Sequence, residues 1–140
     1  EVLSELAATL NFKVLIQTQV DEKDRYDSAD LIFTDPLDLD EIDESVDYFI
    51  LVTHHRDDHH QSLSELNNGI PFVAVIASQK KAGMILDYLK ENNVADEFMA
   101  NFHSPAGLDL NAQTAEEIAL SIMSEIVMHR NSGSGEAMGK

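Results

Sequence analysis

Segments in which apolar residues recur at helical spacing alternate along the chain with short runs of strand-forming residues. Apolar residues recur every three or four positions in these segments: 1–10, 61–68, 79–92 and the stretch that begins at Ala115. This spacing predicts helices with one apolar face. Strand-forming residues are concentrated in the shorter runs 12–20, 29–33, 47–53 and 71–77. Strands that alternate with helices predict an α/β fold whose sheet is mostly parallel.

The cores of the runs at 47–53 and 71–77 are continuously apolar. Such runs are typical of parallel strands that are buried on both faces. The run at 29–33 is followed by Thr34-Asp35-Pro36, which predicts a short strand near a sheet edge. Because helices must then cover both faces of the sheet, we expect a three-layer Rossmann-like sandwich.

The helix from Ala115 is the most strongly specified element. Thr114 and Glu117 form a capping box, in which each side chain can bond the free backbone N–H of the other residue. The apolar face beyond it repeats at four-residue spacing: Ile118, Ile122 and Ile126. Ser78 is predicted to cap the helix over 79–92, and Gly69 to end the helix over 61–68.

With 140 residues, 44% of them hydrophobic, the chain can form one domain with a single core. We predict this domain over 1–130 and a disordered tail over 131–140, where periodicity is lost. No apolar run is long enough for a membrane helix, and the acidic start is unlike a secretory signal. The lack of cysteine excludes disulfides, thiolate metal sites and cysteine nucleophiles. The resulting prediction is a cytoplasmic protein.

A formal net charge of -17 repels phosphate backbones and anionic membrane surfaces. We therefore expect neither nucleic acid nor membrane as a partner. Solubility or adaptation to high salt explains such a charge, and attraction of a basic protein partner is the alternative.

The sequence begins at Glu1 inside a predicted helix. In a Rossmann fold this helix follows the first strand and a Gly-x-Gly-x-x-Gly loop, and we expect both upstream of the residues given. A dinucleotide site also needs an acidic residue at the end of the second strand. The residues at that position are Gln17-Thr18-Gln19, and the first acidic residue after them is Asp21. The lack of an acid at the strand end disfavours an NAD(P) site without excluding it.

Ligands of parallel α/β sheets bind at the carboxyl ends of the strands. Three polar segments are predicted near such ends: Thr53-His54, Ser78 to Lys81, and the loop from His103 to Asp109. We expect these segments to line one crevice.

Lys80 and Lys81 are adjacent in the first turn of a predicted helix, where the helix dipole disfavours cations. Their position is favourable if an anion binds there. Ser78, Gln79 and the free N–H groups of the helix start would then form a cradle for a phosphate or carboxylate. Alternatively, the lysine stems cover apolar surface and pair with nearby acids.

The segment 54–60 is rich in histidine. His55 and His59 are four residues apart and on a helix could share a metal ion, with a neighbouring aspartate as a further ligand. Hydrated neutral imidazoles are commoner, and the segment lacks the specificity of a zincin motif. We therefore predict no metal site. His54 is kept as a ligand-site candidate because it directly follows the strand over 47–53.

The loop from His103 to Asp109 combines polar side chains with Pro105 and Gly107, which impose an unusual backbone path. His103 could orient a substrate or act as a general base, and Ser104 adds a hydroxyl group. Asp109 is expected to accept backbone N–H groups within the loop. Since no nucleophile or carboxylate can be paired with His103, we predict no catalytic residue.

Three segments carry a specific resemblance: Phe72 to Ala82, which reads Phe-Val-Ala-Val-Ile-Ala-Ser-Gln-Lys-Lys-Ala, His103 to Leu110, and Thr114 to Ile122. They resemble the carboxyl-terminal Rossmann-like domain of the XdhC/CoxI family, accessory proteins of xanthine dehydrogenase and related molybdenum hydroxylases. The resemblance runs from about Val46 to His129 and is weaker back to Glu1. Ala77 replaces the glycine of the family's Gly-Ser-Arg-Arg/Lys motif and narrows the approach to a ligand.

The resemblance implies a role in enzyme maturation rather than catalysis. It implies that the protein binds the molybdenum cofactor (molybdopterin), protects it during sulfuration and delivers it to an apo-enzyme. The implied partners are the molybdenum hydroxylase apo-enzyme, a cysteine desulfurase and a second copy of the chain. The residues implied around the cofactor are Thr53, His54, Ser78, Gln79, Lys80 and Lys81, and those of the facing loop are His103, Ser104, Pro105, Gly107 and Asp109.

Two other functions remain open. An NAD(P)-dependent oxidoreductase domain would share the same fold, because the fold does not determine the chemistry. A non-catalytic domain for dimerisation or partner docking is the second alternative, and Ala77 in the ligand-binding turn is compatible with it.

Overall fold

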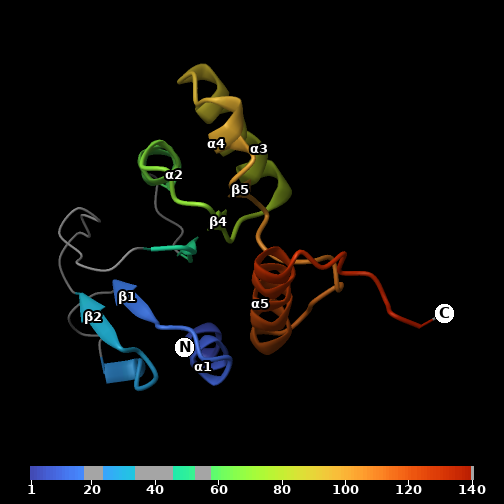
Figure 1. Ribbon diagram of the computed structural model, residues 1–140. Helices are drawn as coiled ribbons and strands as arrows, with labels where there is room; N and C mark the ends of the chain where they lie inside the picture. The colour runs from blue at the N-terminus through green and yellow to red at the C-terminus, as the bar shows by residue number, and fades with distance from the viewer. Residues whose placement is uncertain (18–23, 34–45, 53–57, 140) are drawn as a thin grey trace. The chain divides into compact units, whose positions relative to one another are not determined.

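The computed structural model describes residues 1–17, 24–33, 46–52 and 58–139. The chain divides into two compact units, the first formed by 1–44 together with 107–140 and the second by 45–106. Figure 1 labels the helices and strands of both units. Our prediction of one domain over 1–130 with a disordered tail over 131–140 stays a prediction.

The first unit contains α1 (Val2–Thr9), β1 (Leu15–Gln17), β2 (Leu31–Phe33) and α5 (Ala115–Asn131). The two strands are parallel, with Leu15 opposite Leu31 (Figure 1). The Asp30 carboxylate accepts a hydrogen bond from the Val14 N–H group at 2.7 Å. Helices α1 and α5 pack against each other. The buried apolar side chains of α5 are Ala119, Ile122, Met123 and Ile126.

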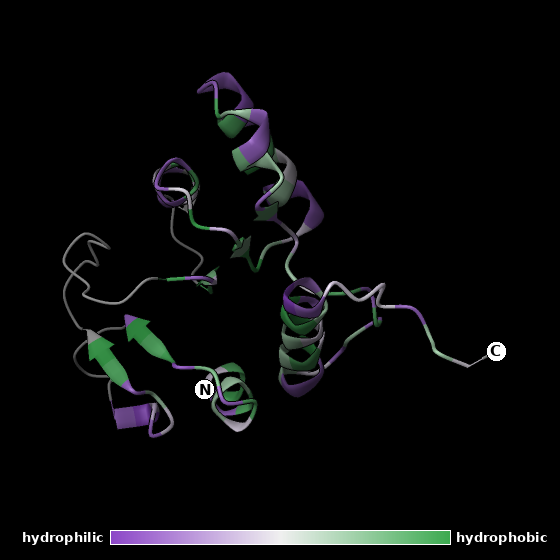
Figure 2. Ribbon diagram, in the orientation of Figure 1, coloured by the Kyte–Doolittle hydropathy of each residue, from purple (hydrophilic) through white to green (hydrophobic). Residues whose placement is uncertain are grey.

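The second unit is a parallel sheet with helices around it. Its elements are β3 (Phe49–Leu51), α2 (Asp58–Asn67), β4 (Val73–Val75), α3 (Gln79–Glu91), α4 (Asp96–Met99) and β5 (Phe102–His103). The strand order is β3-β4-β5 and both pairs are parallel. Helix α2 contacts β4, α3 and α4. Figure 2 shows the hydrophobic colouring of β4 and the mixed colouring of α3, whose buried residues are Ala82, Ile85 and Leu89.

The predicted burial of the two apolar strands is confirmed for β4 and wrong for β3. Every residue of β4 is buried. All residues of β3 are only half-buried, and Val52, which follows it, is 56% exposed. The strand order explains the difference, because β4 has a neighbour on both sides whereas β3 lies at an edge of the described sheet.

The helix boundaries agree with the local signals. Ser78 caps α3, since its Oγ accepts a hydrogen bond from Lys81 N at 3.1 Å. Gly69 follows α2 with a positive φ of 79°, as expected for a residue that ends a helix. Helix α2 begins at Asp58, earlier than predicted, and the short elements α4 and β5 were not predicted. The predicted features of 18–23, 34–45 and 53–57 lie outside the described residues.

The predicted capping box at the start of α5 is confirmed. Glu117 N–H donates to Thr114 Oγ1 at 3.1 Å, and Thr114 N–H donates to Glu117 Oε1 at 3.1 Å. Gln113 N–H donates to the same oxygen at 2.8 Å. The apolar face is less complete than expected, because Ile118 is 39% exposed while Ser121 is buried. Ile118 lies in the first turn, before the helix residues that form the core.

The capping box predicts a pH-dependent stability. The bonds from the Gln113 and Thr114 N–H groups hold the pKa of Glu117 below its usual range. A carboxylate with a lowered folded pKa contributes stability above its unfolded pKa and loses it as the pH falls through the folded pKa. We therefore expect Glu117→Gln to lower the melting temperature at neutral pH and to match the unchanged protein in strong acid.

Thermal unfolding from neutral to strongly acidic pH measures this difference. Glu116→Gln is the matched control, because it removes one charge from an exposed neighbour in the same helical turn. A difference between Glu117→Gln and the unchanged protein that stays constant across the series would contradict the prediction.

Candidate functional site

Two of the predicted segments begin at the carboxyl edge of β4 and β5. The strands are parallel, with Ala74 opposite His103, so the residues that follow each strand leave at the same edge. The Val75 carbonyl at the end of β4 accepts two hydrogen bonds, from Ser104 Oγ at 3.0 Å and from Ala106 N at 3.1 Å. The segment after β5 is thereby tied to the end of β4.

The start of α3 has the electrostatic character of an anion site. Lys80 and Lys81 lie in its first turn, which contains no acidic residue. Ser78, Gln79 and Lys80 are exposed, and Lys81 is half-buried. The first-turn N–H groups of a helix have no carbonyl partner within the helix, and the dipole adds positive potential there. Two cations and these N–H groups therefore point to a favourable location for a phosphate or carboxylate.

His103 belongs to β5 rather than to the loop that follows, where it was predicted. Its pairing opposite Ala74 extends the strand by this residue. The imidazole ring stacks on the ring of Phe72, with centroids 4.0 Å apart and planes inclined by 12°. Phe72 is fully buried, and the Nε2 atom of His103 is buried as well. The histidine thus contacts the hydrophobic core of the second unit.

The β5–α5 loop, residues 104–114, contains a glycine that the structure requires. The Ser104–Pro105 peptide bond is cis, and Gly107 has a φ of 104°. A β-carbon on Gly107 would lie 2.5 Å from Ser121 Oγ. The predicted unusual path at this glycine is confirmed, and its physical cause is a close approach to α5 within the first unit.

Asp109 acts within the same loop. Its Oδ1 accepts a hydrogen bond from Asn111 N at 3.3 Å, and the side chain is exposed. Asn111 has a positive φ of 53°. The prediction that Asp109 accepts backbone N–H groups within the loop is confirmed.

The predicted crevice as a whole stays a prediction. Thr53 and His54 lie outside the described residues. Gly107 and Asp109 belong to the first unit. The other predicted site residues belong to the second unit: Ser78, Gln79, Lys80, Lys81, His103, Ser104 and Pro105.

No group of three or more histidine, aspartate or glutamate side chains in 1–17, 24–33, 46–52 and 58–139 is placed to hold a metal ion. The histidine pair considered from the sequence is only partly within these ranges, because His55 lies outside them. Within the same ranges, no helix is long and apolar enough to cross a membrane.

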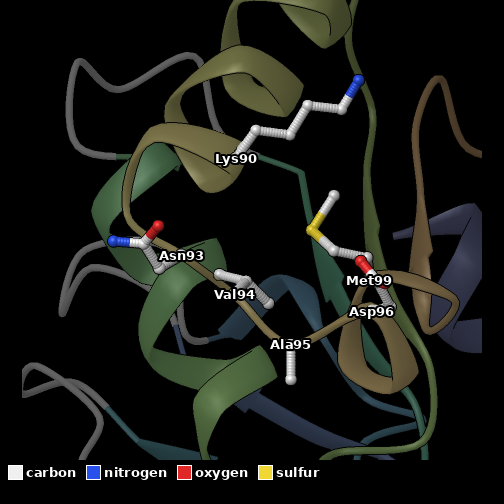
Figure 3. A pocket seen from close by; sticks show the side chains of 6 residues that line it. All are labelled: Lys90, Asn93, Val94, Ala95, Asp96 and Met99. Carbon is white, nitrogen blue, oxygen red and sulfur yellow. The ribbon is translucent and has the colours of Figure 1, made fainter.

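A shallow pocket of about 520 Å³ lies at the other end of α3 (Figure 3). It contains none of the predicted site residues and is lined by Lys90, Asn93, Val94, Ala95, Asp96 and Met99. Its polar residues, Lys90, Asn93 and Asp96, are all exposed. We assign no function to it, because exposed and hydrated groups do not define a ligand.

Sequence reasoning missed several polar residues with structural contacts. Glu125 Oε1 accepts a hydrogen bond from Gly107 N at 2.9 Å, and the Ser121 carbonyl accepts one from Leu108 N at 3.1 Å. Glu65 is only 3% exposed, and its Oε1 accepts a bond from Gln61 Nε2 at 2.7 Å. Charged residues within amphipathic helices are usually solvated, so only the apolar residues around Glu65 and Glu125 could have indicated burial.

Comparison with known proteins places these features in a family. Residues 1–126 match the model of a family described as the XdhC Rossmann domain. An uncharacterized protein of Escherichia coli K12, YqeB, is 30% identical over 102 residues, which are 73% of this chain and 19% of that protein. A solved structure described as a xanthine dehydrogenase from Bacillus halodurans has a TM-score of 0.75 at 22% identity.

The structural match covers 98% of this chain and 41% of the Bacillus halodurans chain, so this chain spans less than half the length of either relative. At this identity the structural likeness supports the fold, and the predicted three-layer Rossmann-like α/β architecture with parallel sheets is confirmed. The match of the family model, over most of the chain, confirms the resemblance seen in the sequence. The chain therefore belongs to the XdhC family and forms its Rossmann domain.

Proposed function

We propose that this chain is a cofactor-binding accessory domain for the maturation of a molybdenum hydroxylase of the xanthine dehydrogenase type. Its ligand is the molybdenum cofactor or a related anionic pterin or nucleotide. Membership of the XdhC family supports the association with xanthine dehydrogenase. The description of the Bacillus halodurans protein as a xanthine dehydrogenase is in keeping with it.

The observation that carries the proposal is the pair of lysines at the start of α3. A cation at this end of a helix is unfavourable by itself, yet Lys80 and Lys81 are adjacent there and no acid lies in that turn. Molybdopterin carries a phosphate group, which is the kind of ligand that first-turn N–H groups and lysines bind. The residues present therefore fit the anionic part of the cofactor.

The chain's own residues hold the cofactor and do not react with it. Lys80 and Lys81 bind the phosphate, with the N–H groups of Gln79 and Lys80 beside them. The 140 residues contain no cysteine, so they offer no thiolate to bind the metal. When bound, the cofactor supplies the molybdenum centre that the client enzyme uses.

The proposed partners are the apo-enzyme that receives the cofactor, a cysteine desulfurase that supplies sulfur, and a second copy of this chain. Nucleic acid is not a proposed partner, because the net charge of -17 repels it. The proposal includes a cytoplasmic location, which the lack of cysteine supports.

The experiment is a titration of the 140-residue protein with molybdenum cofactor released from a purified molybdenum hydroxylase, followed by pterin fluorescence. We expect saturable binding at one site, in competition with inorganic phosphate at high concentration. NAD(P)H and NAD(P)⁺ are titrated in parallel. Binding of the dinucleotide alone would favour the oxidoreductase alternative. Binding of neither ligand would favour the non-catalytic domain for dimerisation or partner docking.

A further inference from the structure

Strand β3 lies at an edge of the sheet that the structure describes in the second unit. The Phe49 N–H group donates to the Phe72 carbonyl at 2.8 Å, and the Leu51 carbonyl accepts from Ile76 N at 3.0 Å. Alternate residues of a strand direct their N–H and carbonyl groups to the same side. Ile50 lies between Phe49 and Leu51, so its N–H and carbonyl groups point away from β4, toward the edge of the described sheet.

This edge lacks the features that protect a strand with one neighbour. Such strands usually carry charged residues, proline or a bulge. The stretch from Tyr48 to Val52 contains no charged residue and no proline. Its strand residues are half-buried, and Val52 is 56% exposed. Because continuous apolar runs are typical of strands inside a parallel sheet, β3 has the sequence of an internal strand.

The pairing of the described strands identifies the neighbour that β3 lacks. The classic Rossmann sheet has the strand order 3-2-1-4-5-6. The observed pairs are β1 with β2, β3 with β4, and β4 with β5. If β1 is counted as the first strand, β3 and β4 become the third and fourth strands, which are not neighbours in that order. If β1 is counted as the second strand, all three observed pairs are neighbours and β3 becomes the fourth strand.

The helix before β1 supports the second count. In a Rossmann fold a helix joins the first strand to the second, and α1 directly precedes β1. A further strand within 34–45 would permit the first count. That segment is rich in acids and contains Pro36, a composition that is depleted in buried strands. In the classic order the fourth strand pairs with the first as well as with the fifth.

We infer that the edge of β3 is a site of strand addition, whose occupant is an apolar strand that runs parallel to β3 and precedes α1 in a longer form of the polypeptide. The Ile50 N–H and carbonyl groups bond to this strand. Strand addition takes its affinity from such main-chain bonds and its selectivity from alternate side chains. The inference goes beyond the proposed function, because no cofactor takes part in it.

The experiment compares the 140-residue protein with a form that is extended ahead of Glu1. The extension is Phe-Val-Ala-Val-Ile-Ala, the sequence of 72–77, followed by a Gly/Ser linker of about 20 residues. The tether raises the local concentration of the added strand without imposing its direction. Phe-Pro-Ala-Pro-Ile-Ala on the same linker is the matched control, because proline lacks the N–H group that a strand needs.

Hydrogen exchange of individual amides by NMR measures the pairing. We expect the Ile50 amide to exchange at least about tenfold more slowly with the apolar extension, and at an unchanged rate with the proline extension. The Phe49 amide, already bonded to Phe72, is the internal control and should change less. Cross-strand contacts between backbone protons give the direction of the added strand, which we expect to be parallel to β3.

The variant Ile50→Pro removes the one N–H group of β3 that points away from β4. In the extended protein it should abolish the gain in melting temperature that the apolar extension produces, since proline is tolerated at a strand edge but cannot donate. Equal Ile50 exchange in the two extended proteins would overturn the inference, as would an antiparallel strand. A dimer of the 140-residue protein in light scattering, with Ile50 protected only at high protein concentration, would assign the edge to a second copy instead.

Discussion

Gly107→Ala is expected to lower the free energy of unfolding by about 2–4 kcal/mol. Two effects add. The φ of 104° at this residue is unfavourable for any residue with a β-carbon. In addition, the new β-carbon would lie 2.5 Å from Ser121 Oγ and 3.2 Å from Ser121 Cβ, so the loop or α5 must shift. Urea unfolding followed by circular dichroism measures the loss.

Two other glycines provide matched controls for the separate effects. Gly69 has a positive φ of 79°, and a β-carbon added to it would meet nothing within 4 Å, so Gly69→Ala introduces the backbone strain alone. We expect it to cost about 1–2 kcal/mol. Gly83 is a helical residue of α3 with open space around it, and Gly83→Ala should raise stability by about 0.5–1 kcal/mol. Equal losses for Gly107→Ala and Gly69→Ala would contradict the close contact with Ser121.

Replacing Lys80 and Lys81 together by alanine is expected to weaken binding of molybdenum cofactor about 100-fold or more, as for the loss of two charged hydrogen bonds. The melting temperature of the ligand-free protein should rise, because both cations lie at the positive end of α3. Opposite effects on binding and stability distinguish a ligand-binding pair from one that supports the fold.

The control is the double variant Lys13→Ala with Lys90→Ala. It removes the same charge from two exposed positions, one of them in the last turn of α3. We expect unchanged binding and a lower melting temperature, since a cation at the carboxyl end of a helix is favourable. Equal loss of binding in both double variants would mean that net charge alone attracts the cofactor. A fall in melting temperature for Lys80→Ala with Lys81→Ala would show that the lysines stabilise the fold instead.

Local chemistry was sufficient to predict several parts of the fold and of the site. The Ser78 cap, the box formed by Thr114 and Glu117, and the glycine requirement at Gly107 involve residues a few positions apart or a single backbone angle. The buried strand β4 was evident from its continuous apolar run. The motifs around Ser78 and His103 were also sufficient to indicate the family.

Other features could not be predicted because they depend on which strand is central. The runs of β3 and β4 have similar composition, yet β3 lies at an edge of the described sheet and stays half-exposed. The sequence also could not show whether His103 lies in a strand or in the loop after it. His103 follows Phe102 directly in β5, and only the register with β4 brings its ring onto Phe72.

The sequence by itself determined the order of the main helices and strands, the helix caps, the anion-favouring start of α3 and membership of the XdhC family, because these follow from residues close together in the chain. Only the tertiary structure decided that Val75 anchors the segment after β5 and that Glu125 holds Gly107. Those bonds join groups far apart in the sequence, and side-chain periodicity carries no information about such partners.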